Sequence, residues 1–344
     1  MGHPSLRHHG DVDAEPGLLD FAVNVQGSGP PTWLRDRIVA VLDDLGRYPG
    51  AAHDLAAREA VARRHGRRPE EVLVLAGSAE GFTLLPHLRP RRAAVLHPGF
   101  TEPEVALRDA GVPVVRVLTD AADGHRLTPV PAEADMVVVG NPTNPTGVLH
   151  PAADIRALAA PGRVVVVDEA FADAVPGEPE SLAGEPGPLV FRSLTKSWAL
   201  AGLRAGYVLG APDLLARLAA RRPPWPVSTP ALEAVIACCE PAAVAEARAS
   251  AQRLVIRRAE QAAALTAVDG VTVLPGRAPY LLLQLPAGHG ERVRLALRTA
   301  GIAVRRCDTF PGLDADHLRV AVRPAEQVTR LTAALADALL GVAA

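Results

Sequence analysis

Several common sequence features are absent from this chain of 344 residues, and each absence excludes a class of protein. No apolar run reaches the length of about 18 residues that a transmembrane helix needs, so no membrane partner is expected. There is no basic block and the net charge is −2, which argues against binding to nucleic acid or to an anionic membrane surface. The first fifteen residues hold no apolar core, so no secretory signal is expected.

Cysteine and aromatic residues are also scarce. The three cysteines, Cys238, Cys239 and Cys307, have no metal-binding spacing, and their odd number argues against a disulfide framework. A reducing, cytoplasmic location is therefore expected. With hydrophobic residues at 49% and charged residues at 22%, the composition is that of an ordinary globular protein with a large core.

Short apolar runs alternate with helical patterns in the first two thirds of the chain. The runs cover residues 72–76, 93–96, 112–118, 136–139, 164–167, 188–191 and 207–209. Fully apolar strands that alternate with helices predict an α/β fold with a buried, mostly parallel, doubly wound sheet. Earlier helices are expected over residues 33–45 and 54–65, the second of them ended by Gly66.

The pattern changes after the Pro-rich residues 221–226, which look like a hinge. One long helical region is expected over residues 230–268. Beyond it, strands near 271–274, 280–285, 302–305 and 318–322, with helices near 290–300 and 325–340, predict a smaller α+β domain. We therefore expect a large domain of residues 27–226 and a small domain made of residues 1–26 and 227–344, with residues 1–26 as an arm.

The stretch of residues 191–207 carries the strongest chemical signal. Lys196 follows two hydroxyl groups, Ser193 and Thr195, and Arg204 comes eight residues later. An amine beside hydroxyl and guanidinium groups suits a phosphorylated carbonyl cofactor, bound covalently by the lysine and through its phosphate by the other groups. Taken alone, the stretch is also compatible with an exposed loop of solvated charges.

Polar clusters follow five of the predicted strands, and the carboxyl ends of such strands meet at one edge of the sheet. Asp168 would pair with a cation such as a protonated pyridine nitrogen, and Asn144 would donate to a phenolate oxygen. Ser78, at a helix start, suits a phosphate as well as a simple helix cap. Phe100 would stack on a flat ring or belong to the core.

Two arginines of the small domain, Arg305 and Arg319, are expected on neighbouring strands. They would bind anionic substrate groups in the cleft between the domains, unless they are solvated surface residues. His8, His9 and Asp11 resemble a metal cluster only weakly, so no metal site is predicted.

With Asp168, Lys196 and Arg204 in this order, the whole chain resembles the fold-type I pyridoxal-phosphate enzymes. Within them it is similar to the branch that holds histidinol-phosphate aminotransferase and threonine-phosphate decarboxylase. The strings that carry the resemblance include Arg47-Tyr-Pro, Pro98-Gly-Phe, Asp168-Glu-Ala-Phe, Arg192-Ser-Leu-Thr-Lys and Arg319-Val-Ala-Val-Arg.

The resemblance implies a role for each matching residue. Lys196 would anchor pyridoxal 5'-phosphate and move protons. The other residues in contact with the cofactor would be Asp168, Asn144, Phe100, Ser78, Ala79, Ser193, Thr195 and Arg204. Tyr48 would reach into the site of a second copy, which implies a homodimer with shared active sites. Arg319 would bind the carboxylate of a small amino-acid substrate, and His8, Asn24 and Arg305 a substrate phosphate.

Several positions depart from that branch. Phe171 stands where its aminotransferases have tyrosine, which fits the decarboxylase better. Asp11 stands where the decarboxylase has asparagine, and an acid there would repel a phosphate. The best hypothesis is a decarboxylase similar to the threonine-phosphate enzyme of cobalamin biosynthesis. The alternatives are an aminotransferase of histidinol-phosphate type and a non-catalytic cofactor-binding or regulatory protein.

Overall fold

A computed structural model describes residues 6–340, and a mixed sheet of seven strands forms its larger half. The order is β2-β8-β7-β6-β5-β3-β4, and only β8 runs antiparallel to its neighbours. The strands are β2 Val72–Leu75, β3 Ala93–His97, β4 Val114–Leu118, β5 Met136–Gly140, β6 Val164–Asp168, β7 Leu189–Ser193 and β8 Gly206–Leu209.

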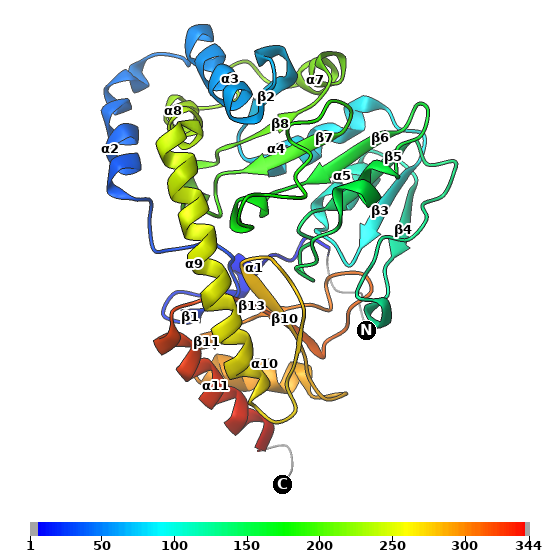
Figure 1. Cartoon of the computed structure of the whole chain (residues 1–344), viewed down its shortest axis with the longest axis vertical. Coiled ribbons are helices and arrows are strands. Elements are labelled where there is room, and N and C mark those ends of the chain that lie inside the picture. The colour runs from blue at the N-terminus through cyan, green and yellow to red at the C-terminus, as the bar shows by residue number, and fades with distance from the viewer. Residues whose placement is uncertain (1–5, 341–344) are drawn as a thin grey trace.

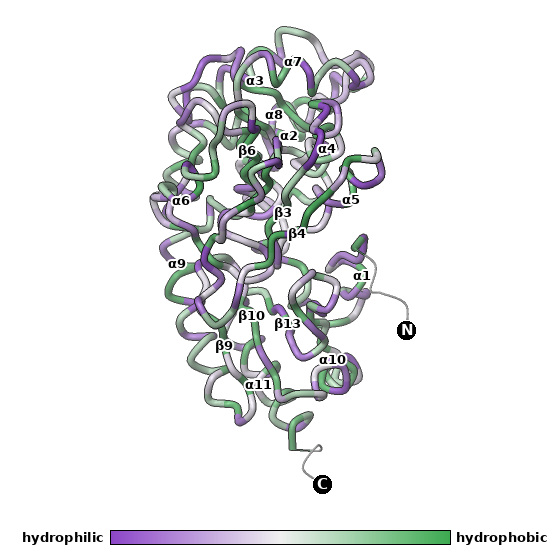
Figure 2. Tube along the Cα trace, turned by 90° about the vertical axis from the view of Figure 1, so that its right-hand side faces the viewer, coloured by the Kyte–Doolittle hydropathy of each residue, from purple (hydrophilic) through white to green (hydrophobic). Residues whose placement is uncertain are grey.

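Helices cover both faces of this sheet (Figure 1). They are α2 Thr32–Ala40, α3 Ala51–His65, α4 Ser78–Leu84, α5 Glu102–Asp109, α6 Ala152–Arg156, α7 Pro212–Ala219 and α8 Thr229–Cys239. One apolar core joins the sheet to α3 and α8, and a second joins it to α4, α5 and α7. Because both faces are buried, the strands are nearly continuous apolar runs, and β3 and β4 appear green in the hydropathy view (Figure 2). The predicted α/β class is confirmed.

The smaller half holds a four-stranded antiparallel sheet of order β12-β13-β10-β9 and a two-stranded parallel pair, β1-β11. Its elements are α1 Gly10–Asp13, β1 Leu19–Asp20, α9 Pro241–Thr266, β9 Thr272–Leu274, β10 Tyr280–Gln284, α10 Gly290–Thr299, β11 Ile302–Ala303, β12 Arg305–Arg306, β13 His317–Ala321 and α11 Ala325–Leu340. Helix α9 extends from the large sheet to this half (Figure 1). Within residues 6–340 no helix is long and apolar enough to cross a membrane.

Short 3-10 turns complete the secondary structure. They are η1 Leu42–Gly46, η2 Pro69–Glu71, η3 Leu85–Leu88, η4 Ala121–Asp123, η5 Ala172–Ala174 and η6 Ala201–Leu203.

Three predicted elements differ from the structure. The long helical region is two helices, α8 and α9, because Pro241 has no N–H to continue the first one and Glu240 is extended (φ −65°, ψ 147°). The strand expected over residues 302–305 is two strands, since β11 pairs with β1 and β12 pairs with β13. The helix expected over residues 33–45 ends at Ala40 and continues as the 3-10 turn η1.

The N-terminal arm packs on the smaller half. Strand β1 pairs with β11, and the Arg323 guanidinium donates to the carbonyls of Asp20, Val23 and Val25 at 2.6–2.8 Å. The arm then passes to the large sheet, where the Gln26 N–H donates to the Lys196 carbonyl at 2.9 Å. These bonds fix the arm between both halves; residues 1–5 of it lie outside the described residues.

A cluster of buried ions lies behind strands β6 and β7. The Arg192 side chain, 1% exposed, donates to Glu169 at 3.0 Å, to Glu178 at 2.6 Å and to Asp173. Arg64 donates to the same Asp173 at 2.6 Å. The two guanidinium groups hold the pKa of Asp173 below its ordinary value despite burial, which by itself raises it. Three carboxylates and two arginines therefore satisfy one another inside the protein.

This cluster yields a stability prediction. Replacing Arg192 with Met leaves buried carboxylates without a cation, which costs roughly 3–5 kcal/mol of unfolding free energy. The matched control is Arg156→Met, because Arg156 pairs with Glu185 at the surface and such pairs contribute less than about 1 kcal/mol. Urea denaturation followed by circular dichroism measures both. Equal losses for the two variants would contradict a structural role for the cluster.

Candidate functional site

A cavity of about 540 Å³ opens at the carboxyl ends of the large sheet, against the smaller half. Its walls come from the arm, from the loops after β2, β3, β5, β6 and β7, and from β12 and β13. The predicted site residues that line it are Asn24, Ser78, Ala79, Phe100, Asn144, Asp168, Ser193, Thr195, Lys196, Arg204, Arg305 and Arg319. The structure thus brings together residues that are up to 295 positions apart, from Asn24 to Arg319 (319 − 24 = 295).

Lys196 is the only lysine in the 344-residue sequence. Burial, together with the positive charges of Arg319 and Arg204, lowers the pKa of its amine to about 8. Asp168 and Asp11 oppose this shift without cancelling it. A larger share of the amine is therefore neutral near physiological pH, as an amine that attacks a carbonyl or accepts a proton must be.

Asp168 ends strand β6, and burial raises the pKa of its carboxyl to about 6. Its Oδ1 accepts the Ala170 N–H at 3.1 Å, and the amine of Lys196 also favours its charged form. At pH 7 the group is mostly ionised, but no arginine or histidine within residues 6–340 forms an ion pair with it. A cationic ring nitrogen in the cavity would supply the missing partner.

Donor groups gather at one end of the cavity. The Ser193 and Thr195 hydroxyls lie 2.6 Å apart, and Ser78 and Ala79 open helix α4, whose first N–H groups have no partner within the helix. The Arg204 guanidinium lies against Gly77. A Cβ atom added to Gly77 would lie only 2.6 Å from Nη2 of Arg204. Gly77 (φ +81°) thus makes room for the arginine. Hydroxyls, amides and a guanidinium without a carboxylate are suited to a phosphate.

Arg319 connects the two halves of the cavity. Its guanidinium donates to Asn144 Oδ1 and, at 2.7 Å, to the Ala22 carbonyl. With the amide oxygen of Asn24 turned toward it, Asn24 accepts from Nη1 and Nη2 at 3.1 and 3.2 Å. No carboxylate of residues 6–340 pairs with Arg319, although its side chain is 4% exposed. Its charge is available for an anionic ligand, and the Asn144 NH₂ group stays free to donate.

Arg305 lies directly opposite Arg319 in the β12–β13 pair, as the predicted neighbouring strands require. It is more fully engaged than Arg319. It donates to the His8 carbonyl at 2.6 Å and to the Thr309 hydroxyl at 2.7 Å, and its Nη1 lies 3.6 Å from Asp13 Oδ2. Arg305 therefore lines the cavity while it holds the arm in place.

His8 does not line the cavity, contrary to its predicted role at a substrate phosphate. Its Nε2 lies 3.1 Å from both carboxyl oxygens of Asp13, so the imidazole faces the interior of the arm. The next residue, His9, lines the cavity instead and bonds Glu102 at 2.6 Å. Since side chains of adjacent residues point in different directions, the sequence string alone did not distinguish the two histidines.

Two aromatic groups shape the cavity. Phe100 packs between Phe82 and His9, with ring centroids 5.9 and 5.7 Å away. Phe171 packs edge-on against Tyr280. The Tyr280 hydroxyl donates to the Thr143 carbonyl at 2.9 Å, so it does not stand in for the tyrosine hydroxyl expected at position 171 of an aminotransferase.

Tyr48 lies outside the cavity of its own chain. Its side chain stacks on Trp225 with centroids 4.1 Å apart, and both residues are more than half exposed. This placement is compatible with a role in the site of a second copy, which remains a prediction.

The sequence interpretation missed several residues of the site. Glu102 and Phe310 line the cavity, and Asp13 neutralises Arg305 from behind. Glu102 stands two residues after the predicted Phe100, which lies in the loop after β3, so the position of Glu102 near a strand end was a usable signal for a place in the site. A single lysine among 344 residues was a second one. The role of Asp13 has no local signal, because its partner is 292 positions away (305 − 13 = 292).

Comparisons with known proteins agree with this geometry. Residues 19–335 match the family model described as aminotransferase class I and II. A histidinol-phosphate aminotransferase of Mycobacterium bovis is 53% identical over 97% of this chain and 91% of its own length. The threonine-phosphate decarboxylase of Salmonella typhimurium is 36% identical over 95% and 92%. A histidinol-phosphate aminotransferase from Sinorhizobium meliloti, solved with pyridoxal-5'-phosphate, superposes with a TM-score of 0.80 at 20% identity, over 93% of this chain and 90% of its own.

The single lysine permits a direct measurement of its ionisation. In the protein without ligand, acetylation of Lys196 should rise with pH around a midpoint near 8, because only the neutral amine reacts. Arg204→Gln removes a nearby positive charge, so the midpoint should move to higher pH. Mass spectrometry of the peptide that contains residue 196 measures the reaction.

The terminal α-amine, labelled in the same sample, is the internal control and should titrate alike in both proteins. A Lys196 midpoint near the ordinary lysine pKa, or one that Arg204→Gln leaves unchanged, would contradict the assigned environment.

Proposed function

Since the chain belongs to the class I and II aminotransferase family, we propose that it is a pyridoxal-phosphate enzyme that transfers the amino group of a small phosphorylated amine. The reaction would be of the histidinol-phosphate aminotransferase type. When bound, the cofactor supplies an electron sink for the charge that develops on the substrate carbon.

The residues of the cavity suit this cofactor. The unpaired Asp168 carboxylate matches the ring nitrogen, and the donor cluster of Ser78, Ala79, Ser193, Thr195 and Arg204 matches the phosphate. Phe100 borders the space for the ring. Lys196 has an amine with a pKa of about 8, which suits both covalent attachment to an aldehyde and proton transfer near neutral pH.

The bond between Arg319 and Asn144 is the observation that favours transamination. Asn144 would donate to the 3-oxygen of the cofactor through its NH₂ group. Arg319, bonded to Asn144, would then hold an acidic group of the substrate, the phosphate of the amine or the carboxylate of the amino-acid partner. With the acidic group held by Arg319, the bond that breaks would be the one to hydrogen, and Lys196 would accept the proton.

Decarboxylation of a phosphorylated amino acid is the second candidate, and Phe171 favours it. In a histidinol-phosphate aminotransferase of the usual pattern a tyrosine hydroxyl would stand at this position. The second relative, a threonine-phosphate decarboxylase, is also similar along the whole chain. The two candidates share the cofactor site and differ in which substrate bond breaks.

We further propose that two copies of the chain form a homodimer. Several apolar side chains of residues 39–48 are 43–73% exposed, and Trp225, 54% exposed, stacks on Tyr48. Exposed apolar side chains of this kind are typical of a contact between proteins, and a partner copy would bring its Tyr48 to the shared site.

We also propose a cytoplasmic location, which the three buried free cysteines support. The proposed domains are a large one of residues 27–226 and a small one of residues 1–26 and 227–344.

The reaction is decided by assays of the purified protein. The wild-type protein should be yellow, and borohydride should remove the colour. The Lys196→Ala variant should have neither this colour nor any turnover. We expect histidinol phosphate to pass its amino group to 2-oxoglutarate, which yields glutamate and the ketone of the phosphorylated substrate, and we expect no turnover when 2-oxoglutarate is left out. Release of carbon dioxide from phosphothreonine without any keto acid would instead establish the decarboxylase. A colourless, inert wild-type protein would leave the non-catalytic alternative.

The role of Arg319 has its own test. Arg319→Gln should lower kcat/KM by about 100-fold, which is the expected loss of a buried charge-assisted contact of nearly 3 kcal/mol. Arg306→Gln is the matched control, since Arg306 lies on β12 and pairs with Asp308 away from the cavity lining. Steady-state kinetics with the better amine measures both. Similar kcat/KM values for Arg319→Gln and the wild type would remove the argument for transamination.

A further inference from the structure

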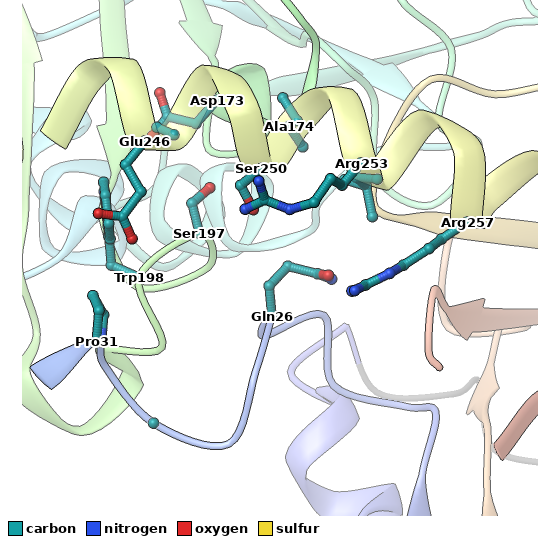
Figure 3. A pocket seen from close by; sticks show the side chains of 14 residues that line it. Gln26, Pro31, Asp173, Ala174, Ser197, Trp198, Glu246, Ser250, Arg253 and Arg257 are labelled. Atoms are coloured by element: carbon teal, nitrogen blue, oxygen red, sulfur yellow. The ribbon is translucent and has the colours of Figure 1, made fainter. Parts of the chain in front are cut away.

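A second cavity, of about 230 Å³, lies where the arm, the loop after Lys196 and helix α9 meet (Figure 3). None of its lining residues belongs to the lining of the larger cavity. It is bounded by Gln26 and Pro31 of the arm, by Ser197 and Trp198 of the loop, and by one face of α9. It therefore contacts the segment that follows Lys196 and shares no lining residue with the cofactor site.

Helix α9 directs a polar stripe into this cavity. Glu246, Ser250, Arg253 and Arg257 follow the spacing i, i+4, i+7 and i+11, which places them on one face of a helix. Figure 3 shows Arg257 extending from α9 toward the side chain of Gln26, while Arg253 extends over the cavity toward Ser250. Neither guanidinium has a hydrogen-bond or ion-pair partner within residues 6–340.

The opposite wall contributes donors that lack acceptors. The Gln26 Nε2 and the Trp198 Nε1 are buried atoms with no hydrogen-bond partner, and Trp198 as a whole is 5% exposed. An unsatisfied buried donor costs about 1–3 kcal/mol. An acceptor that enters the cavity would remove this cost, so the wall is suited to a ligand with oxygen atoms.

The two acidic residues of the lining do not compete for the arginine end. Asp173 is held by Arg64 and Arg192 in the buried ion cluster. Glu246 accepts the Trp33 indole N–H at 2.9 Å and lies at the other end of the cavity from Arg257 (Figure 3). The end formed by Arg253, Arg257 and Gln26 thus offers donors from three side chains and positive charge from two.

We propose that this end of the cavity binds a small oxyanion, a phosphate group or a carboxylate of a small metabolite, at a site separate from the cofactor. The two guanidinium groups, one helical turn apart, hold the oxygens of the anion, and the Gln26 amide donates a further bond. Because the Gln26 N–H also bonds the Lys196 carbonyl at 2.9 Å, an occupied site fastens the arm to the lysine loop and to α9.

The experiment is calorimetric titration of the cofactor-loaded full-length protein that carries Arg319→Gln, so that the cofactor phosphate site is filled and the substrate anion site of the larger cavity is weakened. Inorganic phosphate and succinate are the two probes, and sodium chloride keeps the ionic strength constant. We expect at least one probe to bind saturably at one site per chain and to raise Tm. Arg253→Gln and Arg257→Gln should each weaken binding about tenfold or more, as the loss of a charge-assisted contact requires.

Arg248→Gln is the matched control, because Arg248, Arg253 and Arg257 are all exposed arginines of the same helix and only Arg248 does not line the cavity. Its affinity should stay within about twofold of the parent Arg319→Gln protein. Binding of phosphate alone or succinate alone supports the site and identifies the ligand class. The proposal is overturned if neither probe binds saturably, if Arg253→Gln and Arg257→Gln bind like the parent protein, or if Arg248→Gln weakens binding as much as they do. None of these outcomes depends on which reaction the enzyme catalyses.

Discussion

The buried guanidinium of Arg192 is the constraint on which the site depends. Arg192 lies on β7 and Glu169 directly follows the neighbouring parallel strand β6, and their side chains meet behind the sheet at 3.0 Å. Because side chains alternate along a strand, the adjacent Asp168 and Ser193 face the cavity on the other side. The ion cluster therefore fixes the two strand ends that carry the carboxylate and lead to the lysine. The position of the chemistry is set by ions that take no part in it.

A second dependence joins the two halves of the molecule. Arg319 comes from the small antiparallel sheet, yet it donates to Asn144, in the loop after β5 of the large sheet, and to the Ala22 carbonyl of the arm. A ligand that binds Arg319 therefore acts on the group proposed to contact the ring of the cofactor. The residue proposed for substrate recognition and the residue proposed for the ring of the cofactor are joined by one hydrogen bond, and the residues that line the cavity come from both halves.

The sequence predicted the parts of the molecule that rest on local patterns. Apolar runs located all seven strands of the large sheet, and helix α11 has the predicted bounds. Most predicted cofactor residues lie together because strand ends of a parallel sheet must meet. Pairing between distant segments was not predictable. The division of residues 302–306 between two sheets depends on β1. The orientation of the His8 side chain toward Asp13 depends on Arg305, which pairs with Asp13. Pro241 was a local signal for the helix break that the interpretation passed over.

The arm has a consequence for biosynthesis. Strand β1 is translated 283 residues before its partner Ile302 (302 − 19 = 283), and the carbonyls of residues 20–25 are bonded only after Arg323 has been translated. Contacts of such sequence separation form late and slow folding. The large sheet is complete at Leu209, so it is translated more than 90 residues before these partners (302 − 209 = 93). During that interval Lys196 lies on the large sheet without the arm beside it, and the arm can pack only after residues 302–323 have been translated.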